Sequence, residues 1–436
     1  MKCEMEKGTI KVRRIEVRED KVIFRFSHEG PVSGYFLEDS FYLKADHSLG
    51  NVPEEIMAIP LLGCLVPLSW VTNCEIIADE AEEAFLACIP KVQRVMQRAY
   101  PGLLFQGDLR AKPVRTQGVW NPDRYCLLYS GGIDSLTSFI RNRDKKPDLL
   151  MVRGTPDMRL DDSELFGRTI ERFTPYLDEL GAHLHVLETN ALDALDYQAL
   201  QNSVKSPRIH GWWENFAHGM FLLGMSAPFT YFNGIGKLMI SSSDTIRIAA
   251  PWGSMPESDQ QVRWGNLEVI HDSYDYTKFE KISKVLVPFL SSRKLGGFPM
   301  KVCTGNPSLR IASGKLNCGR CDKCIRTMLM LLENGVDPAR CDFDMRRFSP
   351  QNTRIGLENG YIKLDEYPRT WAFVFDNAHE ISSGLESRYK GSNALFRWMA
   401  GWDRKPKESS LRKFSRQIAP SGSRRRQLAR RVLQKD

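Results

Sequence analysis

Short apolar runs alternate with segments of helical periodicity between residues 125 and 290, and this alternation constrains the fold more than any other feature of the sequence. The apolar runs occupy residues 125–129, 148–154, 183–188, 238–243 and 267–271. The helical segments lie at about 133–143, 163–180, 213–226 and 277–287. Strands that alternate with helices of this length form parallel sheets with helices on both faces. We therefore predict an α/β fold built on a doubly wound parallel five-stranded sheet, with ligands bound beyond the carboxyl ends of its strands.

The region before this sheet has a different pattern. Residues 9–45 alternate in the strand period between short turns, which predicts a small antiparallel meander. Residues 79–100 begin with acidic and end with basic side chains, which suits the dipole of a helix. Prolines and a glycine between residues 101 and 122 then indicate a linker. Because 436 residues exceed what one hydrophobic core usually organises, we expect an N-terminal α+β domain that ends near residue 120.

The net charge of the chain is concentrated at one end. The sequence has a formal net charge of +8, with 42% apolar and 26% charged residues, as is ordinary for a folded globular protein. Residues 403–436 hold twelve lysines and arginines against three acidic residues, so the rest of the chain is close to neutral. Such a basic tail is typical of a solvated segment, and nucleic acid, a membrane surface or an acidic partner are its alternative contacts. Any nucleic-acid contact is therefore expected only through the tail.

The N-terminus lacks the apolar region of a secretion signal, so we expect a cytoplasmic protein whose ten cysteines are thiols or metal ligands. Residues 56–74 are nineteen residues without a charge, which is the length of a membrane span. Pro60, Gly63 and Pro67 interrupt this segment, and acidic rather than basic residues flank it. We predict buried turns and helix pieces there, and no membrane contact.

A glycine turn follows the first apolar run of the sheet, in the motif Ser130-Gly131-Gly132-Ile133-Asp134-Ser135. Glycines let backbone amides approach a ligand, and the start of a helix adds further amides and the positive end of its dipole. This combination favours an anion such as phosphate, with serine hydroxyls as donors and Asp134 as a ligand for Mg²⁺ or a cap for the amides. The spacing fits neither G-x-x-x-x-G-K-[ST] nor G-x-G-x-x-G, and a structural turn with Ser and Asp caps is the alternative.

A cluster of cysteines forms the second motif. Cys303, Cys318, Cys321 and Cys324 follow a C-x14-C-x2-C-x2-C pattern, and four thiolates at such spacing suit a structural, tetrahedral Zn²⁺. An iron–sulfur cluster is the alternative, because all-cysteine ligation serves both. The other six cysteines are scattered along the chain and are expected to be packing thiols.

The order of these two motifs resembles the PP-loop ATP pyrophosphatases and, within them, the QueC-like (7-cyano-7-deazaguanine synthase-like) family. In that family a strand and S-G-G-x-D-S precede a C…CGxCxxC cluster, as they do in this sequence. The segment DYTKFEKISKVLVPF is similar to the family's Thr-Lys helix and places Thr277 and Lys278 at matching positions. The resemblance covers about residues 124–335 and implies a PP-loop/HUP-like fold.

The resemblance implies an ATP-dependent carbon–nitrogen ligase that forms AMP and pyrophosphate. QueC-like enzymes adenylate the carboxylate of 7-carboxy-7-deazaguanine, release pyrophosphate and let an amine attack the acyl-adenylate. The implied cofactors are ATP and Mg²⁺, beside Zn²⁺. The residues implied to be catalytic are Ser130, Asp134, Ser135 and Lys278. The residues implied to bind the nucleotide are Ser130, Gly131, Gly132, Ile133, Asp134, Ser135 and Arg153, for which an ordinary surface arginine is the alternative.

This sequence departs from the family in the segment that binds the substrate. No clear copy of the family's S-G-Y-P-D-C-R segment is present, and residues 247–266 occupy its place. Trp252 is a candidate for stacking on the deazapurine, and Asp259 or Arg263 for pairing with its edge or carboxylate. A core tryptophan and solvated charges are the alternatives. The histidines and tryptophans of residues 209–222 are expected to form a packed helix face.

The chain is also far longer than QueC. In its length and layout it resembles the enlarged QueC-like proteins of bacterial anti-phage defence systems such as Qat. That group implies an amine acceptor on a partner protein rather than ammonia. The alternatives are a metabolic 7-cyano-7-deazaguanine synthase that uses ammonia, a PP-loop tRNA-modifying enzyme and a non-catalytic nucleotide-binding scaffold.

These observations divide the sequence into five predicted segments. They are an N-terminal α+β domain (1–120), a PP-loop nucleotide-binding domain (121–295), a zinc-binding segment (296–335), a helical C-terminal region (336–402) and the basic tail (403–436).

Overall fold

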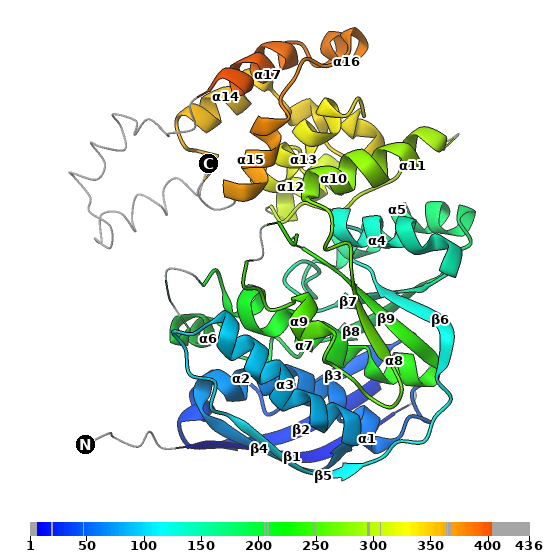
Figure 1. Ribbon diagram of the computed structural model, residues 1–436, viewed down its shortest axis with the longest axis vertical. Coiled ribbons are helices and arrows are strands. Elements are labelled where there is room, and N and C mark those ends of the chain that lie inside the picture. Colours follow the sequence, from blue (N-terminus) through cyan, green and yellow to red (C-terminus); the bar gives the residue numbers. More distant parts are fainter. Residues whose placement is uncertain are drawn as a thin grey trace, which may run out of the picture. The chain divides into compact units, whose positions relative to one another are not determined.

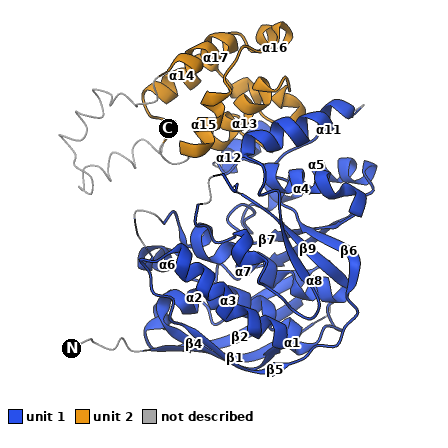
Figure 2. Ribbon diagram, viewed as in Figure 1, with its two compact units in different colours: residues 1–316 blue, residues 317–436 orange. Residues whose placement is uncertain are grey.

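The computed structural model describes residues 7–402 except 19–20, 47, 205, 207–208, 244, 248–249, 294–296, 306, 363 and 365–367. The basic tail at 403–436 therefore lies outside the described residues. The chain forms two compact units, residues 1–316 and 317–436 (Figure 2). The finer domain boundaries drawn from the sequence stay predictions.

Unit 1 is built on one ten-stranded mixed sheet with the strand order β10-β9-β6-β7-β8-β3-β2-β1-β4-β5 (Figure 1). The strands are β1 (Gly8–Val17), β2 (Lys21–Glu29), β3 (Ser40–Ala45), β4 (Cys74–Glu82), β5 (Asp108–Val114), β6 (Asn121–Leu128), β7 (Asp148–Arg153), β8 (Leu184–Thr189), β9 (Ile235–Ser241) and β10 (Glu268–Asp272). The predicted α/β class is confirmed, but the sheet is larger and more mixed than the sequence suggested.

Five neighbouring strands of this sheet, from β10 through β9, β6 and β7 to β8, are parallel. Each of them overlaps one of the five apolar runs of the sequence. Counted in chain order, their arrangement is 5-4-1-2-3, and the winding direction reverses between β6 and β9. In open sheets of this kind, the crevice beyond the carboxyl ends at the point of reversal is where ligands bind.

The N-terminal strands extend the same sheet instead of forming a sheet of their own. Strands β1, β2 and β3 make the predicted antiparallel meander, and β3 pairs antiparallel with β8. Two details of the prediction were wrong. Residues 79–82 end strand β4 rather than begin a helix, and the predicted linker contains β5. Strand β5 is an edge strand whose residues are exposed or half-buried, so it lacks the apolar pattern by which a strand is recognised.

Helices of unit 1 pack against both the parallel strands and the N-terminal strands of the sheet. They are α1 (Glu54–Met57), α2 (Ile59–Thr72), α3 (Glu83–Ala99), α4 (Ile133–Asn142), α5 (Ser163–Glu179), α6 (Tyr197–Ser203), α7 (His218–Met225), α8 (Ala227–Phe232), α9 (Pro256–Asp259), α10 (Lys278–Glu280), α11 (Val287–Ser292) and α12 (Pro307–Ser313), with the 3-10 turns η1 (Gly30–Tyr35) and η2 (Arg143–Lys145) and the π-helical turns η3 (Trp213–Ala217) and η4 (Lys281–Leu286). All four helical segments expected between residues 133 and 287 are confirmed.

Alternate residues of the parallel strands enter two different cores. Cys126 and Leu128 of β6 belong to the large buried cluster that also contains the side chains of α2 and α7. Leu127 is equally buried but points to the opposite face, where α4 packs against β6 and β9. A strand with both faces buried reads as a continuous apolar run, which is why these strands were visible in the sequence.

The uncharged segment 56–74 forms the buried helix α2. Gly63 lies inside this helix, where α2 crosses α7. A Cβ at Gly63 would be 2.8 Å from the carbonyl oxygen of Met220 and 3.0 Å from the Cα of Gly224, so the close crossing of the two helices requires glycine. The predicted burial and helical structure are confirmed, but the predicted turns are not, because α2 continues through Pro60, Gly63 and Pro67. Within the described residues, no helix has both the length and the apolar character that crossing a membrane requires.

Unit 2 is helical, as expected for the C-terminal region. Its elements are α13 (Asp322–Glu333), α14 (Pro350–Glu358), α15 (Pro368–Asp376), α16 (Ser383–Arg388) and α17 (Ser392–Gly401), with the 3-10 turns η5 (Pro338–Cys341) and η6 (Met345–Arg347). Helix α13 packs against α15, and the indole N–H of Trp371 donates to Asp322 Oδ1 at 2.9 Å.

Glu333, the last residue of α13, is a buried acid in unit 2. Neither of its carboxyl oxygens has a hydrogen-bond partner among the described residues. Burial raises the pKa of Glu333 to about 9, so the carboxyl group is protonated in the folded protein at neutral pH. In an unfolded chain the pKa of glutamate is about 4.3. The folded state therefore binds more protons than the unfolded state between about pH 4 and pH 9, and its stability falls as the pH rises through that range.

We expect Glu333→Gln to stabilise the protein at pH 8, because a neutral amide avoids the ionisation that unfolding allows. This group alone should lower the free energy of unfolding of the wild type by up to about 1.4 kcal/mol per pH unit within the range, and the variant should lose that slope. Urea unfolding at several pH values measures both proteins. Glu358→Gln, at a partly exposed glutamate on α14, is the control and should keep the wild-type slope. Equal slopes in all three proteins would contradict the argument.

Candidate functional site

The glycine motif lies at the carboxyl end of β6, beside the point where the sheet reverses its winding direction. Gly131 has a φ of 74°, and a Cβ built on it would be 2.1 Å from Cζ of the buried Phe173. The residue is therefore glycine for two reasons, its left-handed backbone and the ring against it. Gly132 has a φ of −78° and only ordinary contacts at its Cβ position.

Serine hydroxyls hold the turn in this shape. Ser135 Oγ accepts a hydrogen bond from the Ser130 N–H at 3.2 Å and donates to the Gly132 carbonyl at 3.3 Å. Ser130 is exposed, whereas Ser135 is buried. Helix α4 begins at Ile133, so the N–H groups of its first turn have no partner within the helix. The turn thus has backbone amides and one exposed hydroxyl at the carboxyl edge of the sheet.

Asp134, in the first turn of α4, is held by two lysines. Lys278 Nζ lies 2.5 Å from Asp134 Oδ2, and Lys281 Nζ lies 2.8 Å from Oδ1. The side chain of Lys281 is only 1% exposed, compared with 22% for Lys278, and Lys281 also donates to the carbonyl oxygen of Ser242 just after β9. These contacts link three segments, because Asp134 follows β6, Ser242 follows β9 and the two lysines follow β10.

A capping box positions both lysines. The Thr277 hydroxyl accepts from the Glu280 N–H at 3.1 Å, and Glu280 Oε2 accepts from the Thr277 N–H at 3.0 Å. This reciprocal pair fixes the start of α10. Lys278 and Lys281 are three residues apart on consecutive helical turns, so both extend from one face toward α4. The predicted Lys278 is therefore brought to the glycine motif.

The electrostatics of this cluster favour an anion. Burial of the Asp134 carboxyl raises its pKa, but the adjacent ammonium groups of Lys278 and Lys281 outweigh it, and the net pKa of Asp134 is well below its ordinary value. The carboxyl is thus ionised, and the cluster of two lysines and one aspartate carries one net positive charge. Both Asp134 oxygens are already bound to lysines, so the carboxylate is poorly suited to hold Mg²⁺ in this arrangement.

The segment that precedes the first cysteine of the cluster also contacts the glycine turn. The Lys301 N–H donates to the Gly131 carbonyl at 2.8 Å, and Lys301 Nζ donates to the Asp157 carbonyl at 2.6 Å. Both bonds belong to the carboxyl edge of the sheet, because Asp157 follows β7. The turn is therefore supported by a second segment besides α4.

Asp259 and His271 form a second polar group near this edge. His271 Nδ1 is 2.9 Å from Asp259 Oδ2, and that oxygen also accepts from Ser254 Oγ at 2.6 Å. The side chains of His271 and Asp259 are 1% and 2% exposed. Asp259, expected from the sequence to face a substrate, thus has its contacts inside the protein, while His271 was not anticipated.

The other predicted substrate and nucleotide residues have partners of their own in the protein. Arg153, at the end of β7, pairs with Glu188 at 2.7 Å and donates to Ser163 Oγ at 2.7 Å, so its guanidinium is engaged. Trp252 is half-buried, and its ring centroid is 5.8 Å from that of His210. Arg263 is half-buried and donates to the adjacent Val262 carbonyl. Their assignments to a ligand stay predictions.

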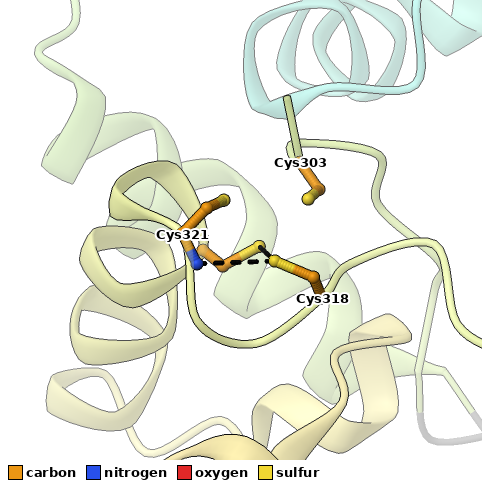
Figure 3. Close-up of side chains that lie close together, drawn as sticks. Cys303, Cys318 and Cys321 are labelled. Carbon is orange, nitrogen blue, oxygen red and sulfur yellow. Dashed lines mark hydrogen bonds between the residues drawn. The ribbon is translucent and has the colours of Figure 1, made fainter. Parts of the chain in front are cut away.

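The four clustered cysteines converge as the sequence predicted (Figure 3). The sulfur atoms of Cys303, Cys318, Cys321 and Cys324 all lie within 4.8 Å of one another, and those of Cys318 and Cys324 are 3.9 Å apart. Four ligands at the usual zinc–sulfur length of about 2.3 Å place tetrahedral sulfurs about 3.8 Å apart. This donor set can therefore hold a tetrahedral metal ion such as zinc, with protein ligands at all four positions.

Backbone geometry supports the cysteine cluster. The Cys321 N–H donates to the Cys318 sulfur at 3.4 Å, and the Gly305 N–H donates to the Cys303 sulfur at 3.4 Å. Gly319 has a φ of 69°, and a Cβ there would be 2.1 Å from the Asp344 carbonyl oxygen. Only glycine fits this tight turn between two ligands.

Two residues of this edge were missed from the sequence, Lys281 and His271, whereas His218 lies in the segment 209–222 that we expected to form a packed helix face. Lys281 carried a usable signal, since it lies three residues after Lys278 on the same helix. His271 carried none, because it lies in residues 267–271, which form one of the apolar runs of the sequence. Comparison of the chain with protein-family models, curated proteins and solved structures gave no match.

Gly131→Ala should destabilise the protein by at least about 2 kcal/mol, because the new methyl group meets Phe173 and the backbone is left-handed. Gly132→Ala should cost less than about 1 kcal/mol, since its Cβ position has only ordinary contacts. Thermal and urea unfolding of the two variants measure the difference. Similar stability of both variants would show that the turn does not have the described backbone.

Purified wild-type protein should contain a single zinc ion per chain by elemental analysis. Substitution of any one of Cys303, Cys318, Cys321 or Cys324 by alanine should remove most of it, because three remaining thiolates leave the site open. Cys341→Ala, at a buried cysteine outside the cluster, is the matched control and should keep the metal. Iron and sulfide in place of zinc would identify the alternative cluster instead.

Proposed function

We propose that this protein is a QueC-like, ATP-dependent carbon–nitrogen ligase that adenylates a carboxylate and releases pyrophosphate. The observation that carries the proposal is the Asp134–Lys278–Lys281 cluster beside the left-handed Gly131, where the sheet reverses its winding direction. Amides, a helix start and a net positive charge together suit the phosphates of a nucleotide. The reversal in the order of the parallel strands and the cysteine cluster are compatible with the same family.

The two lysines have different exposure, which suggests different roles. Lys281 is buried and stays with Asp134, where it neutralises the carboxylate. Lys278 is partly exposed, so it can turn from Asp134 toward a phosphate without leaving the aspartate unpaired. The exposed Ser130 hydroxyl and the amides from Gly132 onward would bind the same anion. Together these groups would stabilise the charge that develops on pyrophosphate as it leaves, which is catalysis by positioning and electrostatics.

The acid, the acceptor and the cofactors follow from the resemblance and complete the proposal. The acid is 7-carboxy-7-deazaguanine, and the amine belongs to a partner protein in an anti-phage defence system. ATP binds at the glycine turn, and Mg²⁺ enters with the triphosphate. Zinc at the cysteine cluster would be structural, since four thiolates leave no open position for a reaction.

The proposal predicts pyrophosphate release on incubation of the protein with ATP and 7-carboxy-7-deazaguanine. Lys278→Ala should lower that rate by about 10²–10³-fold, because it removes a charge aimed at the leaving group. Lys284→Ala, at an exposed lysine further along the same helical segment, is the matched control and should stay within about twofold of the wild type.

Intact mass measurement of added partner proteins separates the outcomes. A partner heavier by the acyl group supports protein conjugation, whereas free nitrile product beside an unchanged partner supports the metabolic synthase. No pyrophosphate release with any candidate acid would overturn the ligase proposal. Full activity of Lys278→Ala would contradict the role that the proposal gives to the Asp134–Lys278–Lys281 cluster.

A further inference from the structure

We infer that His271, oriented by Asp259, is the catalytic residue that takes the proton from the attacking amine in the second half of the reaction. The inference rests on the proposed ligase function and adds to it a general base. The glycine turn offers N–H donors and both lysines are paired with Asp134, so these groups are not suited to accept a proton from an amine.

The hydrogen bonds of the pair define which nitrogen is free. Asp259 Oδ2 accepts from His271 Nδ1 at 2.9 Å and from Ser254 Oγ at 2.6 Å, and Asp259 Oδ1 is 3.3 Å from Ser258 Oγ. The tautomer that carries its proton on Nδ1 can donate to Asp259 Oδ2, and this is the tautomer that the inference requires. His271 Nε2 then has a lone pair available to accept a proton.

That nitrogen is buried and has no hydrogen-bond partner among the described residues. Leaving such an atom unpaired costs on the order of 1–3 kcal/mol. A structural histidine in a packed core would normally find a partner or be replaced by an apolar residue. An unsatisfied acceptor beside a bonded aspartate fits a group that meets its partner only when a substrate is bound.

The position of His271 suits this role. It is next to last in β10, close to the carboxyl edge of the sheet, and it pairs in register with Ile240 of β9. Ile240 belongs to the core that contains α7, so His271 points to that same face. A Cβ at Gly219 of α7 would be 2.5 Å from Asp259 Oδ1, so α7 lies directly against the pair.

His218, the first residue of α7, precedes Gly219, which lies against Asp259. Its Nδ1 is also buried without a hydrogen-bond partner in the described part of the chain. Burial lowers the pKa of His218, while the negative charges of Asp259 and Asp134 act on it in the opposite direction. His271, Asp259 and Asp134 are all among the charged groups that act on the pKa of His218.

The chemical step balances without any further reagent. The amine nitrogen forms a bond to the acyl carbon of the acyl-adenylate, and the bond from that carbon to the phosphate oxygen breaks. AMP leaves with the electron pair of that bond. The surplus proton of the nitrogen passes to His271 Nε2, which becomes an imidazolium stabilised by Asp259.

The test separates the two half-reactions. Exchange of labelled pyrophosphate into ATP with 7-carboxy-7-deazaguanine reports adenylation, and product formed with ammonium reports transfer. Hydroxylamine is the second acceptor, because it is largely unprotonated at neutral pH and a strong nucleophile, so it needs little help from a base. His271→Gln and Asp259→Asn are the variants. In Asp259→Asn, the new side-chain amide would donate to His271 Nδ1, which moves the histidine proton to Nε2 and removes the lone pair there.

Both variants should keep exchange within about threefold of the wild type, which also shows that they fold. Transfer to ammonium should fall by about 10²–10⁴-fold, and transfer to hydroxylamine by less than about tenfold. His185→Gln, which removes the partly exposed His185–Asp46 pair at the other end of the parallel strands, is the control and should change neither reaction.

Three results would overturn the inference: unchanged transfer to ammonium, an equal loss with both acceptors, or loss of exchange in both variants. The first two assign the pair to structure or to substrate positioning, and the third to adenylation or folding. Absence of exchange in the wild type is a different result, because it removes the proposed function itself.

Discussion

The Asp134 carboxylate between two lysines is the interaction on which the arrangement of the carboxyl edge depends. The side chain of Lys281 is buried, and a buried ammonium is tolerated only beside an ionised partner and with its other protons bonded. Asp134 supplies the charge, and the Ser242 carbonyl oxygen accepts a second hydrogen bond from the Lys281 ammonium group. The two hydrogen bonds of the buried Lys281 thus fix the start of α4, the end of β9 and the helix after β10 relative to one another.

Contacts on several sides hold the glycine turn in one shape. Gly131 is closed in by Phe173 and by the Lys301 backbone, and the Ser135 hydroxyl ties the turn to itself. A turn held at so many points presents its amides without further rearrangement. Preorganised amides cost little to align when an anion arrives, which is the basis of electrostatic catalysis. Two buried histidine nitrogens, His271 Nε2 and His218 Nδ1, have no hydrogen-bond partner in the described part of the protein.

The one continuous sheet has a consequence for stability as well. The antiparallel pairing of β3 with β8 joins the N-terminal meander to the parallel strands. Without that meander, β8 would be an exposed edge with unpaired backbone groups. The N-terminal region thus protects the parallel sheet on one side, and its helix α2 supplies much of the core against α7.

The sequence by itself determined features that depend on neighbours along the chain. Strands buried on both faces are apolar runs, the left-handed turn needs Gly131, and the cysteine spacing needs Gly319, so each could be read locally. Only the tertiary structure decided which distant groups meet. That β3 pairs with β8, that the buried Lys281 joins Lys278 at Asp134, and that Asp259 faces His271 are contacts between separate elements. Such contacts depend on the packing of whole elements, and no pattern in a short window of sequence encodes them.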